Sequence, residues 1–149
     1  MDKLSLIKVQ SNRLIFLGML LFFLGLIVGL AVPAMVNPRM GLSTHLEGIM
    51  NGIVLILIGL IWNRLELGSR WLKITFWLLL YGSFANFIAV FIAAITGAGK
   101  MMPIAGGKEG TPIIEGIISF LLISLALAML TVCIFVMAGL YKSLNKKDI

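Results

Sequence analysis

Hydrophobic residues gather in four long stretches along the chain, and polar or charged residues separate these stretches. The stretches cover approximately residues 14–34, 45–62, 71–95 and 113–141. A helix needs about 20 residues to cross the hydrocarbon layer of a membrane, and none of the stretches alternates with the two-residue period of a half-buried strand. A membrane span must satisfy its backbone hydrogen bonds internally. The pattern therefore predicts an all-α integral membrane protein, a single bundle of four transmembrane helices over residues 1–149.

Composition supports this interpretation. The chain has 149 residues, of which 60% are hydrophobic and 12% are charged. A soluble domain carries about 45–50% apolar and about 25% charged residues. We therefore expect the lipid bilayer, rather than water, to surround most of the chain.

Lysine and arginine are distributed unequally over the segments that flank the stretches. Nine lie in the N-terminal segment, the second connection and the tail: Lys3, Lys8, Arg13, Arg64, Arg70, Lys73, Lys142, Lys146 and Lys147. The first and third connections carry Arg39, Lys100 and Lys108. Because cytoplasmic loops are enriched in these residues, both termini are predicted to be cytoplasmic. The charges fall at helix ends rather than on one soluble face, so nucleic acid is not an expected partner.

The second stretch begins with polar residues. His45, the only histidine, stands close to Glu47 and Asn51, directly before the apolar run 53–62. That run is too short to span a membrane alone, so we place the start of the second helix at about His45. Polar groups at this depth are costly and usually mark a site. At about 100° per residue, Glu47 and Asn51 share one face of the helix, and His45 lies on another.

Gly48 and Gly52 share the stripe of His45, and their spacing allows two interpretations. A Gly-x-x-x-Gly pair lets two membrane helices approach closely. Alternatively, the glycines leave a flat space beside His45 in which a planar macrocycle can lie against the backbone.

Asn86 and Glu115 are polar residues of the third and fourth stretches. An amide in hydrocarbon must find a partner, so Asn86 either holds helices together or belongs to a site. Glu115 is either a helix-start carboxylate or points into the bundle toward His45. The connections place both groups with His45 and Asn51 in the outer half of the bundle.

Other chemistries have little support. One histidine, one cysteine and two acids in the outer half are too few for a zinc or iron site built from protein alone. Cys133 is the only cysteine, which excludes a disulfide framework and a CxxCH haem attachment. A proton relay through Glu47, His45 and Glu115 is a further alternative.

These residues make the chain resemble the styrene oxide isomerases, small four-span membrane proteins that bind haem b. Members of that family rearrange an aryl epoxide to an aldehyde without net redox change. The resemblance is carried by His45 followed by Asn51-Gly52, and by Asn86 in the third span. A connection rich in glycine and proline then leads to a fourth span that opens with Glu115.

The resemblance implies roles for these positions. His45 would be the axial ligand of the haem iron, Asn51 would orient the bound oxygen, and Asn86 would be a second catalytic residue. The other candidates for contact with the cofactor are Gly48, Gly52 and Glu115. Ferric iron would act as a Lewis acid that opens an epoxide to an aldehyde or ketone. The resemblance also implies a homotrimer with haem near the subunit interfaces, and a compact catabolic protein of this kind suits a bacterial inner membrane.

Two positions depart from the family pattern. Val90 stands where the family has a tyrosine, one turn after the third-span asparagine, and Gly82 replaces an acid four residues before it. Both positions line the substrate pocket in the family, so we expect a different epoxide or another oxygenated, lipid-soluble substrate. Two alternatives stay open. One is a haem-binding membrane protein without catalysis, such as a cytochrome subunit, sensor or carrier, and the other is a structural four-span accessory protein.

Overall fold

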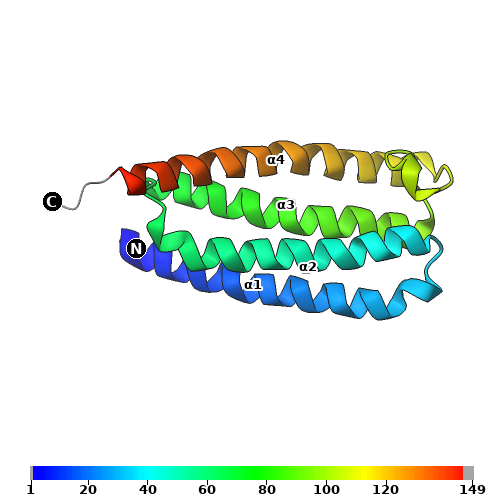
Figure 1. Cartoon of the computed structure of the whole chain (residues 1–149). Coiled ribbons are helices and arrows are strands. Elements are labelled where there is room, and N and C mark those ends of the chain that lie inside the picture. Colours follow the sequence, from blue (N-terminus) through cyan, green and yellow to red (C-terminus); the bar gives the residue numbers. More distant parts are fainter. Residues whose placement is uncertain (1, 146–149) are drawn as a thin grey trace.

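The computed structural model describes residues 2–145, which form four long helices joined by short connections (Figure 1). The helices are α1 (Lys3–Ala31), α2 (Pro38–Ile61), α3 (Ser69–Thr96) and α4 (Pro112–Leu144). Three single turns of 3-10 helix lie in the connections: η1 (Val32–Ala34), η2 (Trp62–Arg64) and η3 (Pro103–Ala105). Between residues 2 and 145 there is no strand, only an isolated bridge between Ala98 and Lys108. The predicted all-α architecture is confirmed.

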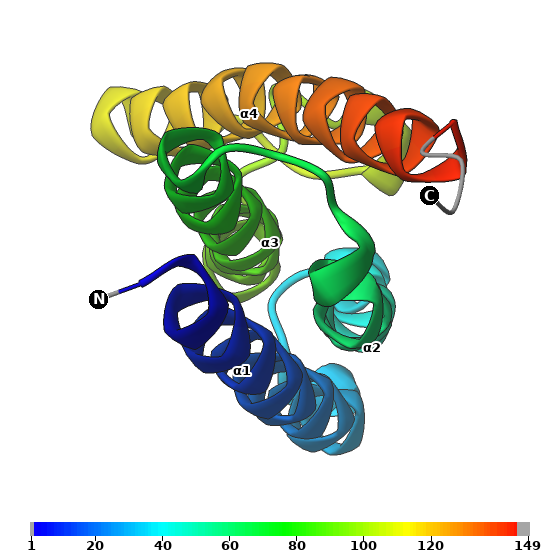
Figure 2. The same cartoon turned by 90° about the vertical axis from the view of Figure 1, so that its left-hand side faces the viewer.

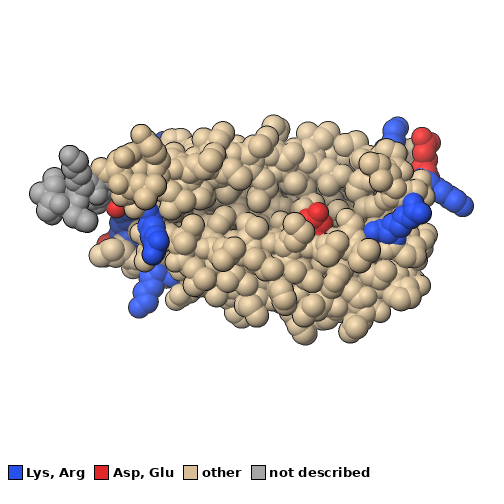
Figure 3. All heavy atoms as spheres, viewed as in Figure 1, with Lys and Arg blue, Asp and Glu red and all other residues tan. Residues whose placement is uncertain are grey.

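All four helices are long and apolar enough to cross a membrane. The shortest has 24 residues and the longest 33, and their most apolar windows have mean hydropathies of 1.8 to 2.8. Lysine and arginine gather at the two ends of the bundle, and the face between them in Figure 3 carries hardly any charged group. The start of α1 and the end of α4 lie at the same end of the bundle (Figure 1). We call the opposite end, where residues 32–37 and 97–111 join the helices, the outer end; its orientation in a membrane stays a prediction.

Two helices begin earlier than the hydrophobic pattern indicates, because capping residues extend them. Asp2 accepts a hydrogen bond from the Ser5 amide at 3.1 Å, which starts α1 before its apolar part. Asn37 accepts one from the Met40 amide at 3.2 Å, and a proline follows it in the first turn of α2. Both features are typical of helix starts. His45 consequently lies roughly two turns inside α2 rather than at its beginning.

The helices pack as two tight pairs, α1 with α2 and α3 with α4, and α2 and α3 join the pairs. Figure 2 shows α1 and α4 on opposite sides of the bundle. Glycines bring α1 and α2 together: a Cβ at Gly48 would lie 2.6 Å from the Gly25 Cα, and one at Gly52 would lie 2.7 Å from the Gly18 carbonyl oxygen. The structure thus shows the helix-packing role for the pair on α2.

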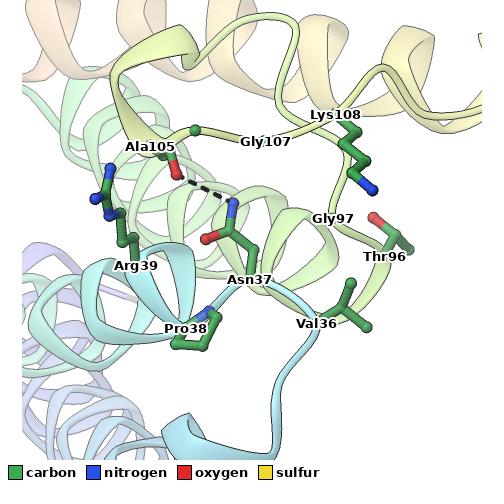
Figure 4. A pocket seen from close by; sticks show the side chains of 10 residues that line it. Val36, Asn37, Pro38, Arg39, Thr96, Gly97, Ala105, Gly107 and Lys108 are labelled. Atoms are coloured by element: carbon green, nitrogen blue, oxygen red, sulfur yellow. Dashed lines mark hydrogen bonds between the residues drawn. The ribbon is translucent and has the colours of Figure 1, made fainter.

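The two outer connections are tied to each other through Asn37. Its side-chain nitrogen donates to the Ala105 carbonyl at 3.4 Å, while its oxygen caps α2. Figure 4 shows Asn37 between Arg39 and Lys108 on a hollow of about 490 Å³. Gly97, with φ of 76°, ends α3 in the left-handed conformation that glycine adopts without strain. The long connection therefore folds back over the outer ends of α2 and α3.

Candidate functional site

A cluster of three polar side chains lies between α2 and α3, well inside the apolar part of the bundle. Glu47 Oε2 accepts a hydrogen bond from Asn51 Nδ2 at 3.0 Å and a second from Asn86 Nδ2 at 2.5 Å. The first bond joins residues one turn apart on α2, as their spacing predicts. The second crosses from α3 and provides the partner that an amide in hydrocarbon requires.

Helix geometry brings Glu47 and Asn86 to the same depth. Glu47 lies nine residues after the start of α2, and Asn86 lies ten residues before the end of α3. At 1.5 Å per residue, these positions are about 14 Å and about 15 Å from the outer helix ends. The antiparallel arrangement therefore places both groups in one layer of the bundle. Acidic atoms are visible within the apolar surface, away from both ends (Figure 3).

The hydrogen bonds fix the orientation of both amides. A carboxylate only accepts, so each asparagine must turn its nitrogen toward Glu47. Each amide oxygen is then directed away from Glu47, and among residues 2–145 neither makes a hydrogen bond within the protein. All three side chains are half-buried. The cluster can thus accept hydrogen bonds from the N–H or O–H groups of a small molecule, and its carboxylate can hold a proton.

His45 is held by the backbone of α1. Its Nδ1 lies 2.8 Å from the Gly25 carbonyl oxygen. A carbonyl only accepts, so Nδ1 carries the hydrogen of the neutral ring, and Nε2 keeps its lone pair. In proteins, a metal-binding imidazole is usually oriented by a hydrogen bond from its other ring nitrogen to a carbonyl or carboxylate. The arrangement supplies one oriented imidazole nitrogen that is able to bind a metal.

The room beside His45 is provided by Gly29 of α1. A Cβ at Gly29 would lie 2.5 Å from His45 Nδ1 and 2.8 Å from Cε1. The ring lines an open hollow of about 500 Å³ whose other residues are apolar, among them Leu26, Leu30 and Leu42. The space expected beside Gly48 and Gly52 is filled by α1 instead. The hollow thus combines apolar walls with one imidazole, a lining that suits an apolar group carrying a metal.

His45 and the Glu47 cluster lie on different faces of α2. Glu47 follows His45 by two residues and Asn51 follows it by six, which rotates them by roughly 200° and 240° about the helix axis. One face turns to α1 and the other to α3, as the hydrogen bonds show. Within one chain, the structure does not join them into a single pocket.

Glu115 lies apart from both groups. It is 7% exposed, and its Oε1 accepts hydrogen bonds from the amides of Gly110 at 2.9 Å and Lys100 at 3.3 Å. It therefore organises the long outer connection, and it lines a different hollow from the one that His45 lines. Its Oε2 is buried and has no hydrogen-bond partner in the described structure.

Glu47 was considered only for a proton relay with His45 and Glu115, whereas the structure makes it the partner of both asparagines. Gly29 was missed as a candidate; it makes room for His45, and its signal was the Gly25-x-x-x-Gly29 spacing on the first helix. No group of three or more His, Cys, Asp or Glu residues able to hold a metal occurs between residues 2 and 145.

These features define a class: a four-helix membrane protein with a polar cluster within its apolar body and one oriented histidine. Comparison with known proteins gives the family. The sequence model of the styrene oxide isomerase family matches residues 10–141, so the chain belongs to this family. The family resemblance seen in His45, Asn51 and Asn86 is thereby confirmed.

Two relatives are similar over most of their length. The chain is 50% identical to hydroxylaminobenzene mutase HabB of Ectopseudomonas oleovorans over 132 residues, which is 87% of this chain and 80% of HabB. It is 48% identical to hydroxylaminobenzene mutase HabA of the same organism over 127 residues, 84% of this chain and 94% of HabA. No solved structure matches the chain. The family and these relatives make the chain a membrane protein of the isomerase and mutase class.

Proposed function

We propose that the chain is a membrane mutase that rearranges hydroxylaminobenzene, or a closely related aryl hydroxylamine, to an aminophenol. The observation that carries the proposal is the polar cluster of Glu47, Asn51 and Asn86 in a chain about half identical to two hydroxylaminobenzene mutases. In this reaction the N–O bond breaks, a ring carbon gains the oxygen, and the proton lost from that carbon balances the hydrogen gained by nitrogen. No oxidant or reductant is needed.

Rearrangement of an epoxide to an aldehyde or ketone is the second candidate, favoured by the family match over residues 10–141. Both reactions begin with cleavage of a bond to oxygen in a lipid-soluble molecule, and neither changes the overall oxidation state. The hydroxylamine ranks first because the two mutases are about half identical to the chain over most of its length. Val90 and Gly82, at the positions where the family pattern has a tyrosine and an acid, agree with a substrate other than an aryl epoxide.

The polar cluster supplies hydrogen bonding and proton transfer in this proposal. The amide oxygens of Asn51 and Asn86 accept the N–H and O–H of the substrate, which orients the N–O bond. Glu47 takes the proton that the ring carbon loses, and the two amides stabilise its carboxylate through their bonds to Oε2. Hydrogen bonds to a charged group contribute about 1.5–3 kcal/mol each.

His45 is the residue that would hold the iron of a haem b group. Gly25 orients its ring, Gly29 leaves room beside it, and Nε2 is the nitrogen left to bind a metal. Bound haem would supply ferric iron, a Lewis acid for the substrate oxygen.

A second copy of the chain is the natural means of combining the two faces of α2. The hollow beside His45 is open on one side, and the Glu47 cluster faces α3 instead. We therefore place the reaction between copies, in the homotrimer that the family resemblance implies, with the histidine of one copy and the cluster of another. The bacterial inner membrane is the proposed location.

The decisive experiment is turnover of hydroxylaminobenzene by the purified protein, with aminophenol quantified by chromatography and an aryl epoxide assayed in parallel. Asn86→Ala should lower turnover about tenfold to a hundredfold, because it removes one hydrogen bond from a charged carboxylate. Asn63→Ala is the matched control, since Asn63 is exposed at the other end of the bundle. Absence of aminophenol with the wild type would overturn the mutase proposal, and equal rates for the two variants would remove the cluster from it.

Haem and assembly are tested separately. The wild type should show a Soret band at near one haem per chain, and His45→Ala should lose it. A wild type that stays colourless after haem supplementation would overturn the cofactor but not the turnover result. Co-expression of His45→Ala with Asn86→Ala should restore activity that neither variant has alone, because mixed assemblies contain one intact site. No recovery in mixed assemblies would contradict a site shared between copies.

A further inference from the structure

An apolar hollow of about 510 Å³ opens at the outer end of the bundle, on the face of α2 that carries Glu47. Its walls come from two segments far apart in the sequence. Met40 and Ser43 belong to α2, and Met101, Met102 and Pro103 belong to the long outer connection. The hollow is distinct from the one that His45 lines on the α1 side.

Helical register connects this hollow to the polar cluster. Ser43, Glu47 and Asn51 are spaced by four residues, so they lie above one another on one face of α2. Ser43 is about one turn, or 5–6 Å, from Glu47. A small aromatic molecule in the hollow thus has its polar end within one helical turn of the cluster.

The inner wall of the hollow is apolar and continuous with the core. Met40 is 3% exposed and packs in the same cluster of buried residues as Val90, which is 4% exposed. Met102 packs against this cluster from the outer connection. Val90 follows Asn86 by one turn on α3, so the buried apolar residues behind the hollow extend to the polar layer. Methionine adapts its shape to flat or irregular partners.

Two polar residues, Arg39 and Ser43, line this mostly apolar hollow, and Ser43 is the one that stands one helical turn from Glu47. Its side chain is half-buried, and none of the hydrogen bonds among residues 2–145 involves its hydroxyl. By contrast, the neighbouring Thr44 hydroxyl bonds back to the Met40 carbonyl at 2.8 Å. A hydroxyl both donates and accepts. Binding sites for small molecules combine mostly apolar walls with a few such groups.

We propose that this hollow receives the aromatic ring of the substrate and that Ser43 is a specificity residue that hydrogen-bonds the hydroxylamine group. The inference rests on the proposed mutase function. The ring lies against Met40, Met101 and Met102, and the N–OH group points along α2 toward Glu47. A lipid would also match the methionines and Arg39, and competition by phospholipid distinguishes this occupant from the substrate.

Ser43→Leu tests the room for the ring. Leucine suits a helix and fills the hollow, so the KM for hydroxylaminobenzene should rise about tenfold to a hundredfold, the equivalent of losing burial of one large apolar side chain. The matched control is Ser119→Leu, the same change at a half-buried position near the outer end of α4. Ser43→Ala should raise KM only about twofold to tenfold, since it removes one neutral hydrogen bond. Equal KM values for Ser43→Leu and Ser119→Leu would overturn the proposal.

Photolabelling gives a measurement that does not depend on turnover. 4-Azidoaniline carries a ring and a nitrogen like those of the substrate, and trypsin cleaves after Lys100 and Lys108. The expected label lies in the fragment 101–108 and is lost when excess hydroxylaminobenzene competes. Label on the fragment 40–64 as well is expected, because Met40 and Ser43 also line the hollow. Absence of label from 101–108, or a label displaced by phospholipid but not by hydroxylaminobenzene, would overturn the assignment. If the wild type is labelled as expected but forms no aminophenol, the proposed function is overturned, whereas the proposed binding site stands.

Discussion

Gly29→Ala is the sharpest probe of the histidine, because the three atoms nearest to the added methyl group all belong to the ring of His45. Its Cβ would lie 2.5 Å from Nδ1, 2.8 Å from Cε1 and 3.1 Å from Cγ. Non-bonded heavy atoms prefer about 3.5–4.0 Å, so the ring must move by about 1 Å or more. A shift of this size is enough to break the bond of 2.8 Å between Nδ1 and the Gly25 carbonyl oxygen, since such bonds are lost beyond about 3.5 Å.

The change should hardly affect the fold. The lost hydrogen bond costs about 0.5–1.5 kcal/mol, and replacing glycine by alanine within a helix gains about 1 kcal/mol. These terms nearly cancel. The effect on the metal site is larger, because loss of a group that orients a metal-binding histidine lowers metal affinity about tenfold to a hundredfold. Gly29→Ala should therefore keep its unfolding temperature and lose haem.

The assay is haem titration of the purified apoprotein, followed by the Soret band, with thermal unfolding measured on the same samples. Gly116→Ala is the matched control, because a Cβ at Gly116 meets nothing within 4 Å. Haem affinity equal to that of the control would refute the reasoning that Gly29 positions the ring. Loss of both haem and stability would show that the methyl group disturbs the helix pair rather than the histidine alone.

Three other substitutions test the packing. Gly48→Ala places a methyl group 2.6 Å from the Gly25 Cα, and backbone cannot move aside as a side chain can, so unfolding in detergent should show a loss of about 1–3 kcal/mol. Trp62→Phe removes the hydrogen bond of 3.2 Å from the indole nitrogen to the side-chain oxygen of Gln10, a residue that is 5% exposed. The Gln10 oxygen is then left without a partner, which should lower the free energy of unfolding by about 1–3 kcal/mol in the same assay. Turnover should be unchanged. Asn37→Ala removes the cap of α2 and should cost about 1 kcal/mol. Hydrogen exchange should then rise in the outer connection, and unchanged exchange would contradict the tie to Ala105.

The sequence predicts the four helices well because each apolar stretch must form a hydrogen-bonded helix in a membrane. It also predicts that Glu47 and Asn51 share a face, since this depends only on helix period. Helix beginnings are less predictable: α1 and α2 extend beyond their apolar parts because single capping residues, Asp2 and Asn37, satisfy amides there. These starts depend on local hydrogen bonds rather than on hydropathy.

The candidate site was harder to predict, for a geometric reason. Helix period places His45 and Asn51 on different faces of α2, but it does not say which neighbouring helix each face meets. Contacts with α1 and α3 decide this, and they depend on where glycines allow close approach. Glu115 illustrates the same point, because its bonds to the amides of Lys100 and Gly110 depend on the fold of a long connection.

Gly25 links helix packing to the candidate haem site. Its Cα lies so close to Gly48 that a Cβ on Gly48 would come within 2.6 Å of it. Its carbonyl oxygen accepts a hydrogen bond from His45, which precedes Gly48 by about one turn of α2. Close approach of the two backbones is what brings that carbonyl within reach of the short histidine side chain. A larger residue at either glycine would separate the helices and withdraw the acceptor from Nδ1. The glycine contacts of α1 and α2 therefore set the orientation of His45, and substitutions that loosen this pair should lower haem affinity even where they do not touch the ring.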